Sequence, residues 1–208
     1  MKRALISIFA SLFFASALFA QTPEEIIARM DQETNRFDKE GVSMVMDMKI
    51  PILGTFSTTM YTLGGKYKGV IDVKGNVTRI WSDGVTTWSH DAAKNELTIT
   101  NATPSEDNKA ESNVKTLNGI TEGYDVKMKK ETDEAWYFIC TKSKGNTKKD
   151  DPKKMDLVIS KSTYLPLSTS IKEKGITITM RDFSIGVTEE EVTFDPSRYA
   201  DATIIDKR

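Results

Sequence analysis

The chain has 208 residues, with 29 basic and 30 acidic side chains and a net charge of −1 at pH 7. This balance argues against nucleic acid as a partner, because binding to phosphates requires a surplus of basic residues. The one cysteine, Cys140, excludes an internal disulfide, so stability must come from burial and hydrogen bonds. After the N-terminal segment no apolar run is long enough to span a membrane.

The N-terminal segment has the pattern of a cleavable export signal. Lys2 and Arg3 precede an uncharged stretch, Ala4–Phe19. At about 1.5 Å per residue this stretch is too short for the roughly 30 Å hydrocarbon core of a bilayer. We therefore predict a signal peptide over residues 1–20, rather than a membrane anchor. A buried N-terminal helix is the competing interpretation.

Cleavage after Ala20 leaves a mature chain of residues 21–208, which is long enough for one domain with a real core. Cleavage after Ala17 is the alternative, since Ala15 and Ala17 fit the small-residue rule better. No cysteine directly follows the apolar stretch, so we expect no lipid anchor. The mature protein is expected to work outside the cytoplasm.

The mature chain is predicted to begin with a helix. Thr22 can cap it, Pro23 suits the first helical position, and Glu25 completes a capping box. Gly41 predicts its end. Apolar residues recur at helical spacing between these limits: Ile26, Ile27, Met30 and Phe37.

Most of the remaining chain alternates between apolar and polar residues with a period of two, which is typical of strands. The predicted strands are 42–50, 56–62, 67–73, 77–82, 86–90, 96–100, 124–129, 135–141, 155–160, 165–172, 176–183 and 191–194. Tight turns such as Gly64–Gly65 and Lys174–Gly175 separate them. Many short strands of this kind predict a large antiparallel sheet that curls on itself.

Two stretches interrupt this rhythm. The polar segment Asn101–Gly123 has room for one or two short helices lying on the sheet. Lys142–Lys154 is a lysine-rich loop, which we interpret as a solvated connection or as a docking patch for an acidic partner or membrane.

Motifs that carry catalytic chemistry are absent from the sequence. His90 is the only histidine, and without a second His or Cys nearby it offers no set of metal ligands. There is neither a nucleophile elbow nor a glycine-rich phosphate loop. We therefore expect no catalytic residue, no metal and no cofactor. A secreted hydrolase with a dispersed acidic site remains the alternative from a different functional class.

Methionines are the most distinctive apolar residues, because Met44, Met46 and Met48 project from one face of a single predicted strand. Flexible, polarizable methionine can line a pocket for a ligand chain that has no fixed shape, although a methionine-filled core is the competing interpretation. The expected cavity residues are Met44, Met46, Met48, Phe56, Met60, Ile71, Trp81, Trp88, Phe138, Ile178 and Met180. The expected lid residues are Ile26, Ile27, Met30 and Phe37.

Several segments resemble one known family. The hairpin Arg79–Trp88, with Ser82-Asp83-Gly84 followed by Trp88, resembles the S-D-G-x-x-x-W hairpin of the LolA family, the periplasmic carriers of outer-membrane lipoproteins. The segment Lys154–Pro166 is similar to the strand pair that precedes the C-terminal strands in that family. The end of the chain, Val192–Asp206, is similar to the family's F-x-F-x-P…V-x-V-x-D ending. The resemblance covers essentially the whole mature chain.

This resemblance implies an incomplete, strongly curved antiparallel β-barrel of about eleven strands, with helices covering its open side. It implies a non-enzymatic periplasmic chaperone that carries acylated lipoproteins from the inner to the outer membrane. The implied partners are an inner-membrane lipoprotein-releasing transporter and an outer-membrane acceptor, and we expect a monomer. A related carrier or sensor of another lipid is the alternative.

The sequence departs from the family at one turn. Family members often place an arginine before the third strand, where it latches the lid helices. Here the turn reads Gly64-Gly65-Lys66, so Lys66 is the candidate latch, although an ammonium group lacks the planar fork of arginine.

Overall fold

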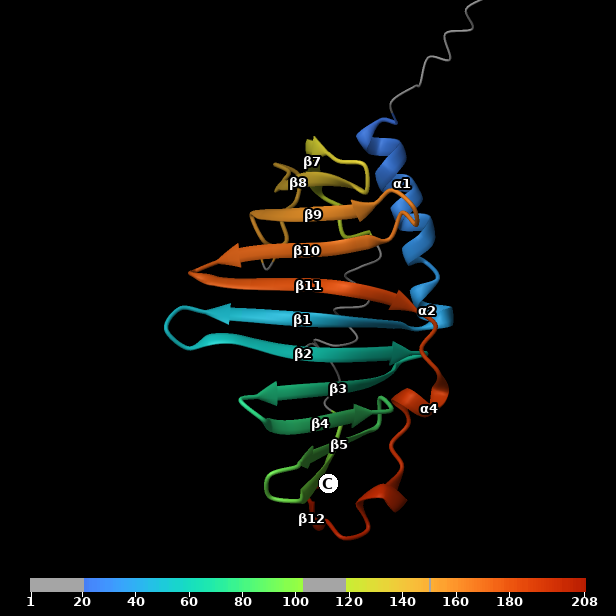
Figure 1. The fold of residues 1–208 in the computed structure, drawn as a ribbon, viewed down its shortest axis with the longest axis vertical. Coiled ribbons are helices and arrows are strands. Elements are labelled where there is room, and N and C mark those ends of the chain that lie inside the picture. The colour runs from blue at the N-terminus through green and yellow to red at the C-terminus, as the bar shows by residue number, and fades with distance from the viewer. Residues whose placement is uncertain (1–20, 103–118, 150) are drawn as a thin grey trace, which may run out of the picture.

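The computed structural model describes residues 21–102, 119–149 and 151–208. Its centre is one sheet of twelve strands in the order β12-β6-β5-β4-β3-β2-β1-β11-β10-β9-β8-β7. Only the pair β12–β6 is parallel, and the other pairs are antiparallel. The labelled helices lie along one side of the sheet (Figure 1). The fold is therefore mainly β, as the alternating pattern predicts.

The limits of β1 to β11 agree closely with the alternating segments, whereas β12 was not among the predicted strands. The first six strands are β1 (Val42–Ile50), β2 (Gly54–Leu63), β3 (Lys66–Val73), β4 (Asn76–Ser82), β5 (Thr86–Asp91) and β6 (Glu96–Asn101). The last six are β7 (Tyr124–Glu131), β8 (Ala135–Lys142), β9 (Lys154–Ser160), β10 (Pro166–Glu173), β11 (Ile176–Ile185) and β12 (Thr203–Asp206).

The leading helix forms as the capping signal predicts, but in two pieces. α1 (Pro23–Thr34) begins with a reciprocal capping box between Thr22 and Glu25. The short α2 (Phe37–Glu40) follows, and it ends at Gly41 with a φ of 75°. The expected end of the helical region is therefore confirmed.

The segment predicted as a strand at 191–194 is not a strand. Residues Glu189–Val192 form the short helix α4, because Thr188 and Glu191 make a second capping box. A 3-10 turn, η1 (Pro196–Tyr199), then leads to β12. The capping box starts a helical turn here, and it outweighs the short alternating pattern.

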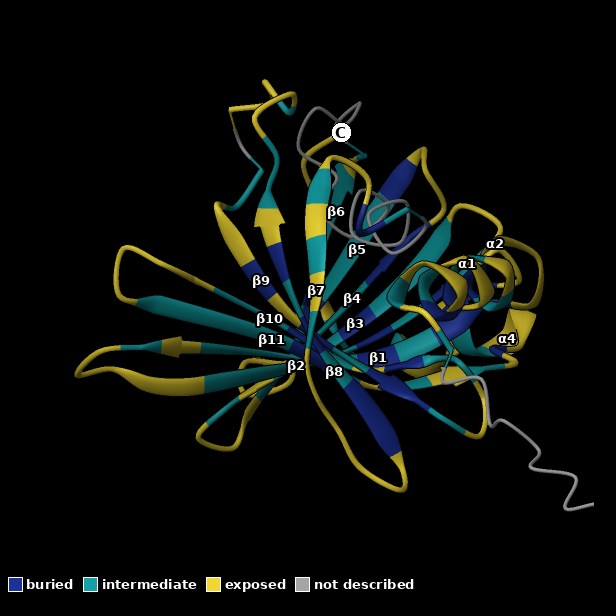
Figure 2. Cartoon of the chain, turned by 90° about the horizontal axis from the view of Figure 1, so that it is seen from above, coloured by how far each residue is buried: buried dark blue, intermediate teal, exposed yellow. Residues whose placement is uncertain are grey.

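The sheet is open and is not strongly curled, in contrast to the strongly curved incomplete barrel that was expected. Its two edge strands, β12 and β7, lie at opposite ends of the strand order and do not pair with each other. Seen from above, the strands fan out around a common axis, so the sheet twists rather than closes (Figure 2). Closure requires a consistent tilt and stagger of every strand, and alternation alone does not set these.

Two expectations fall outside the described residues. Residues 1–20 carry the predicted signal, and 103–118 make up most of the segment with room for short helices. Gly119–Gly123, the described end of that segment, forms turns, and Ile120 is buried. No helix in the described part of the chain is long and apolar enough to cross a membrane.

Candidate functional site

Most of the expected cavity residues share one face of the sheet, here called the methionine face. Residues paired directly across neighbouring strands point to the same side. Met44 is opposite Met60, and Met46 is opposite Met180, so four methionines from three strands gather on this face. The other members by register are Met48, Phe56, Ile71, Phe138 and Ile178.

Burial on the methionine face falls along the strands. Met44, Met60 and Met180 have exposed fractions of 1%, 5% and 7%. Farther along β1, on the side away from α1, Met46 and Met48 are only half-buried. The remaining residues at this half-buried end are Ile50, Phe56, Ile71, Ile176 and Ile178. A closed core therefore continues without a break into a half-buried apolar strip, defined by Met46, Met48 and these five residues.

Several residues outside the expected cavity set belong to the same face. The period-two pattern of β9 and β10 could have identified them, since their pairing with β8 and β11 continues the face. These residues are Cys140, Met155, Leu157, Ile159, Thr169 and Ile171. Most of them are buried, so they extend the closed core rather than the half-buried strip. Thr169 is 1% exposed, and its hydroxyl has no hydrogen-bond partner within the described residues.

The expected lid residues pack on the closed end of the methionine face. Ile26, Met30 and Phe37 have exposed fractions of 0%, 0% and 1%, and they belong to the same core cluster as Met44. Ile27 is partly buried against this cluster. α1 thus runs alongside β7–β10, fixed by its apolar side (Figure 1).

A hollow lies where α1 faces the edge strand β7. Its volume is about 500 Å³, and its walls include Ile27, Asp31, Tyr124 and Val126. Tyr124 and Val126 belong to the methionine face by their pairing with β8. Burial raises the pKa of the Asp31 carboxyl, and one of its oxygens is buried without a hydrogen-bond partner. The hollow therefore combines an apolar wall with one poorly solvated carboxyl group.

The register does not bring Trp81 and Trp88 to the methionine face. Met60 pairs with Gly69, and Gly69 pairs with Ile80, so the neighbouring Trp81 points to the other side of the sheet. Trp88 is directly opposite Trp81 and shares this opposite face.

The opposite face has a second apolar cluster, which fixes the C-terminal segment. Phe194 stacks on Trp88 with ring centroids 4.9 Å apart and meets Trp81 edge-on at 5.5 Å. Tyr199 packs against Trp81 at 5.4 Å. These four rings form the aromatic cluster. Sequence alternation places both tryptophans in strands, but it cannot show that the buried side of the sheet changes between β3 and β5.

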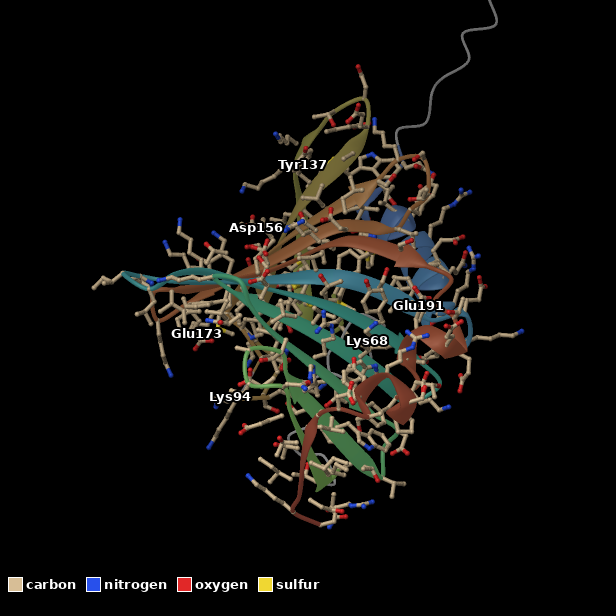
Figure 3. All side chains as sticks on the ribbon, turned by 60° about the horizontal axis from the view of Figure 1, so that its bottom comes forward. Lys68, Lys94, Tyr137, Asp156, Glu173 and Glu191 are labelled. Atoms are coloured by element: carbon tan, nitrogen blue, oxygen red, sulfur yellow. The ribbon has the colours of Figure 1, made fainter. Side chains whose placement is uncertain are left out.

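His90 belongs to this second cluster rather than to a reactive site. Its ring lies 4.6 Å from that of Tyr199, and its Nε2 is 3.2 Å from the Asn95 side-chain oxygen. A hollow of about 430 Å³ beside the cluster contains Lys68 and Glu191, which lie close together in Figure 3. Among the described residues no group of three His, Cys, Asp or Glu side chains could hold a metal ion.

Lys66 forms an ion pair, but with α4 rather than with the leading helix that was expected to be the lid. Its ammonium group makes an ion pair with Glu189 of α4, which joins the start of β3 to the C-terminal segment. The Glu189 side chain is 62% exposed, so the pair contributes at most about 1 kcal/mol. Among the described residues no hydrogen bond or ion pair joins the Lys66 side chain to α1.

A polar network braces the central strands from the opposite face. Arg181 Nε donates to Asp47 Oδ2 at 2.7 Å, and the Ser57 hydroxyl donates to Asp47 Oδ1 at 2.6 Å. The hydrogen bond from Arg181 is the main reason why the pKa of Asp47 is lowered. One carboxylate thus ties β11, β1 and β2 together directly behind the methionines.

No protein-family model matches the chain, and no curated protein matches it. Among solved structures, LprF from Mycobacterium bovis aligns with a TM-score of 0.50 at 11% identity, over 83% of this chain and 97% of that one. An uncharacterized conserved protein from Thermus thermophilus aligns with a TM-score of 0.48 at 17% identity, over 90% and 100%. The LolA superfamily protein NE2245 from Nitrosomonas europaea aligns with a TM-score of 0.36 at 11% identity, over 86% of this chain and 100% of that one.

At these identities the LprF match concerns the fold alone, and the other two are too distant to support an argument. The similar structures do include a member of the superfamily that the sequence resembles. That likeness is not specific enough to place this chain in the family.

Proposed function

We propose that the protein is a non-enzymatic carrier that binds acyl chains of lipoproteins or lipids on the methionine face. The observation that carries this proposal is the unbroken passage from closed core to half-buried apolar strip on one side of the sheet. A purely structural core would bury these side chains fully, whereas Met46, Met48 and Phe56 are only half-buried. Methionine side chains suit a ligand of variable shape.

The energetics favour a partly open site. Each buried methylene contributes about 0.8 kcal/mol, so exposing a sixteen-carbon chain to water costs on the order of 12 kcal/mol. A lipoprotein with such chains needs cover to cross an aqueous compartment. A site that recovered all of this free energy would not release its cargo, and a half-buried strip recovers only part of it.

The resemblance to lipoprotein carriers and the N-terminal signal pattern support a periplasmic setting for this proposal. The protein would then accept acylated lipoproteins from an inner-membrane releasing transporter and pass them, as a monomer, to an outer-membrane acceptor. A carrier of another lipid would use the same face. Mass spectrometry of the lipids and lipoproteins that co-purify from the periplasm distinguishes these two cargoes.

The direct test is to introduce a charged side chain into the half-buried strip. Met46→Glu should weaken the binding of a fluorescent fatty-acid probe by 10-fold or more, because a desolvated carboxylate opposes acyl burial. Val45→Glu is the matched control, since it places the same charge on the same strand but on the opposite face. Equal probe binding by both variants and the parent would contradict the proposal. Turnover of an ester or glycan would instead support the hydrolase alternative.

A further inference from the structure

The turn between β1 and β2 presents large apolar side chains to water. Ile52 is fully exposed at 105%, and the adjacent Leu53 is 63% exposed. Ile52 has a φ of 71°, a conformation that strains a β-branched residue and that glycine or asparagine would adopt with less strain. The turn therefore keeps an isoleucine where neither packing nor backbone geometry favours one. Such a combination points to a function for the side chain.

A second hairpin turn lies against this one. A Cβ placed on Gly175, in the turn between β10 and β11, would be 3.6 Å from Pro51. These two hairpins project farther than the others, on the side of the sheet away from α1 (Figure 1). Pro51, Ile52 and Leu53 are called the apolar tip below.

Lysines surround the apolar tip. Lys49 and Lys172 are both directly opposite Thr177, one from each neighbouring strand, and Lys174 lies in the second turn. Within the described parts of the chain none of these three ammonium groups makes an ion pair. Glu173, the last residue of β10, is the carboxylate next to that turn, and it lies toward the projecting end of the sheet in Figure 3.

The tip is also continuous with the half-buried strip. Ile50, the last residue of β1, has the same orientation as Met48 and Met46, so the strip reaches the turn that holds Ile52. An acyl chain leaving a bilayer at the tip would therefore meet apolar side chains along its whole path.

We propose that the apolar tip inserts into the surface of an anionic lipid bilayer, with Lys49, Lys172 and Lys174 contacting the lipid phosphates. Exposed aliphatic side chains beside cations are the combination that binds such an interface. The role in loading or release of cargo rests on the proposed acyl-carrier function, whereas the docking itself does not.

Co-sedimentation of the protein with vesicles of phosphatidylethanolamine and phosphatidylglycerol tests the proposal. Ile52→Asn combined with Leu53→Ser should weaken partitioning on the order of 10- to 100-fold, because two aliphatic side chains no longer leave water. Asn tolerates the positive φ, so this variant should fold as well as the parent. Val85→Ser, at an apolar residue that is 72% exposed in the turn between β4 and β5, should bind like the parent.

The contribution of the three lysines is tested by the salt dependence of vesicle binding. Replacing Lys49, Lys172 and Lys174 with Gln should weaken binding about fivefold per lysine at low salt. This difference should shrink as salt rises, because screening acts over roughly 8 Å at physiological ionic strength. Neutral phosphatidylcholine vesicles should bind the parent more weakly than the anionic vesicles do.

The proposal would be overturned if the tip variant sedimented with vesicles as the parent does, or if the parent bound neutral and anionic vesicles equally. It would also be overturned if the parent bound no vesicles but self-associated, and the tip variant did not self-associate. The last result would assign the tip to a second copy of the chain. The proposed function fails separately. If the parent binds vesicles but no acyl probe, docking stands and the carrier function does not.

Discussion

Gly41 joins the leading helix to the sheet, and replacing it with alanine should destabilise the protein strongly. Its φ of 75° and ψ of 157° lie in a region that only glycine occupies readily. A Cβ at this position would be 2.8 Å from the Thr62 carbonyl oxygen and 2.8 Å from the Val187 Cβ. Both neighbours are themselves fixed, because Thr62 is paired with Val42 between β2 and β1 and the Val187 side chain is buried.

The magnitude follows from two costs. The unfavourable backbone conformation costs about 1–3 kcal/mol. Displacing a backbone carbonyl and a buried valine adds about 1–3 kcal/mol. Gly41→Ala should therefore lower the free energy of unfolding by about 2–6 kcal/mol, which corresponds to roughly 4–24 °C in melting temperature for a chain of this size.

Gly84→Ala is the matched control for this prediction. Gly84 has a φ of 87°, but no atom lies within 4 Å of the added Cβ. Only the conformational cost of about 1–2 kcal/mol applies there. Urea unfolding followed by circular dichroism measures both variants. Losses of equal size would refute the steric argument and leave the backbone conformation as the whole effect.

Three further predictions concern charge and motion. Asp47→Asn should destabilise the protein most at neutral pH. Because the pKa of Asp47 is lowered from its ordinary value of 3.8, its carboxylate stabilises the fold at pH values above 3.8, and this stabilisation is lost as pH falls through the folded-state pKa. The difference in unfolding free energy between parent and variant should therefore be smaller near pH 3 than at pH 7, and an equal difference at the two pH values would contradict this. If α1 opens as a lid, its amides should exchange with deuterium much faster than those of β1 and β11, whereas equal protection would assign it to the core. If the lysine-rich loop is a docking patch, replacing Lys148, Lys149, Lys153 and Lys154 with Gln should slow cargo transfer at low salt without changing lipid affinity; unchanged transfer rates would leave the loop as a solubility feature.

Local signals in the sequence predicted the elements well. The capping box at Thr22 and the glycine at 41 bracket the helical region, and the alternation from Val42 to Ile50 gives the limits of β1. These signals depend on hydrogen bonds and side-chain directions within a few residues. The break at Asn35 and the helix at Glu189–Val192 are the local exceptions.

Non-local features were harder to derive. Alternation identifies Trp81 and Trp88 as strand residues, but the side of the sheet that is covered there depends on Phe194 and Tyr199, about a hundred residues later. The expectation of a strongly curved barrel failed for a similar reason, since bending depends on pairing across the whole sheet. Nine of the eleven expected cavity residues share a face because the strand register links them.

The strand order also has a consequence for folding kinetics. The centre of the sheet joins β1 to β11, and the Asp47–Arg181 ion pair there spans 134 positions of sequence. The edge strand β12, which is the parallel partner of β6, comes only from Thr203–Asp206, near the end of the chain. Contacts this distant close late, so we expect folding in milliseconds to seconds, and only after nearly all of the polypeptide is present. Such a delay would keep the chain unfolded during translocation across a membrane, which suits the export signal predicted for residues 1–20.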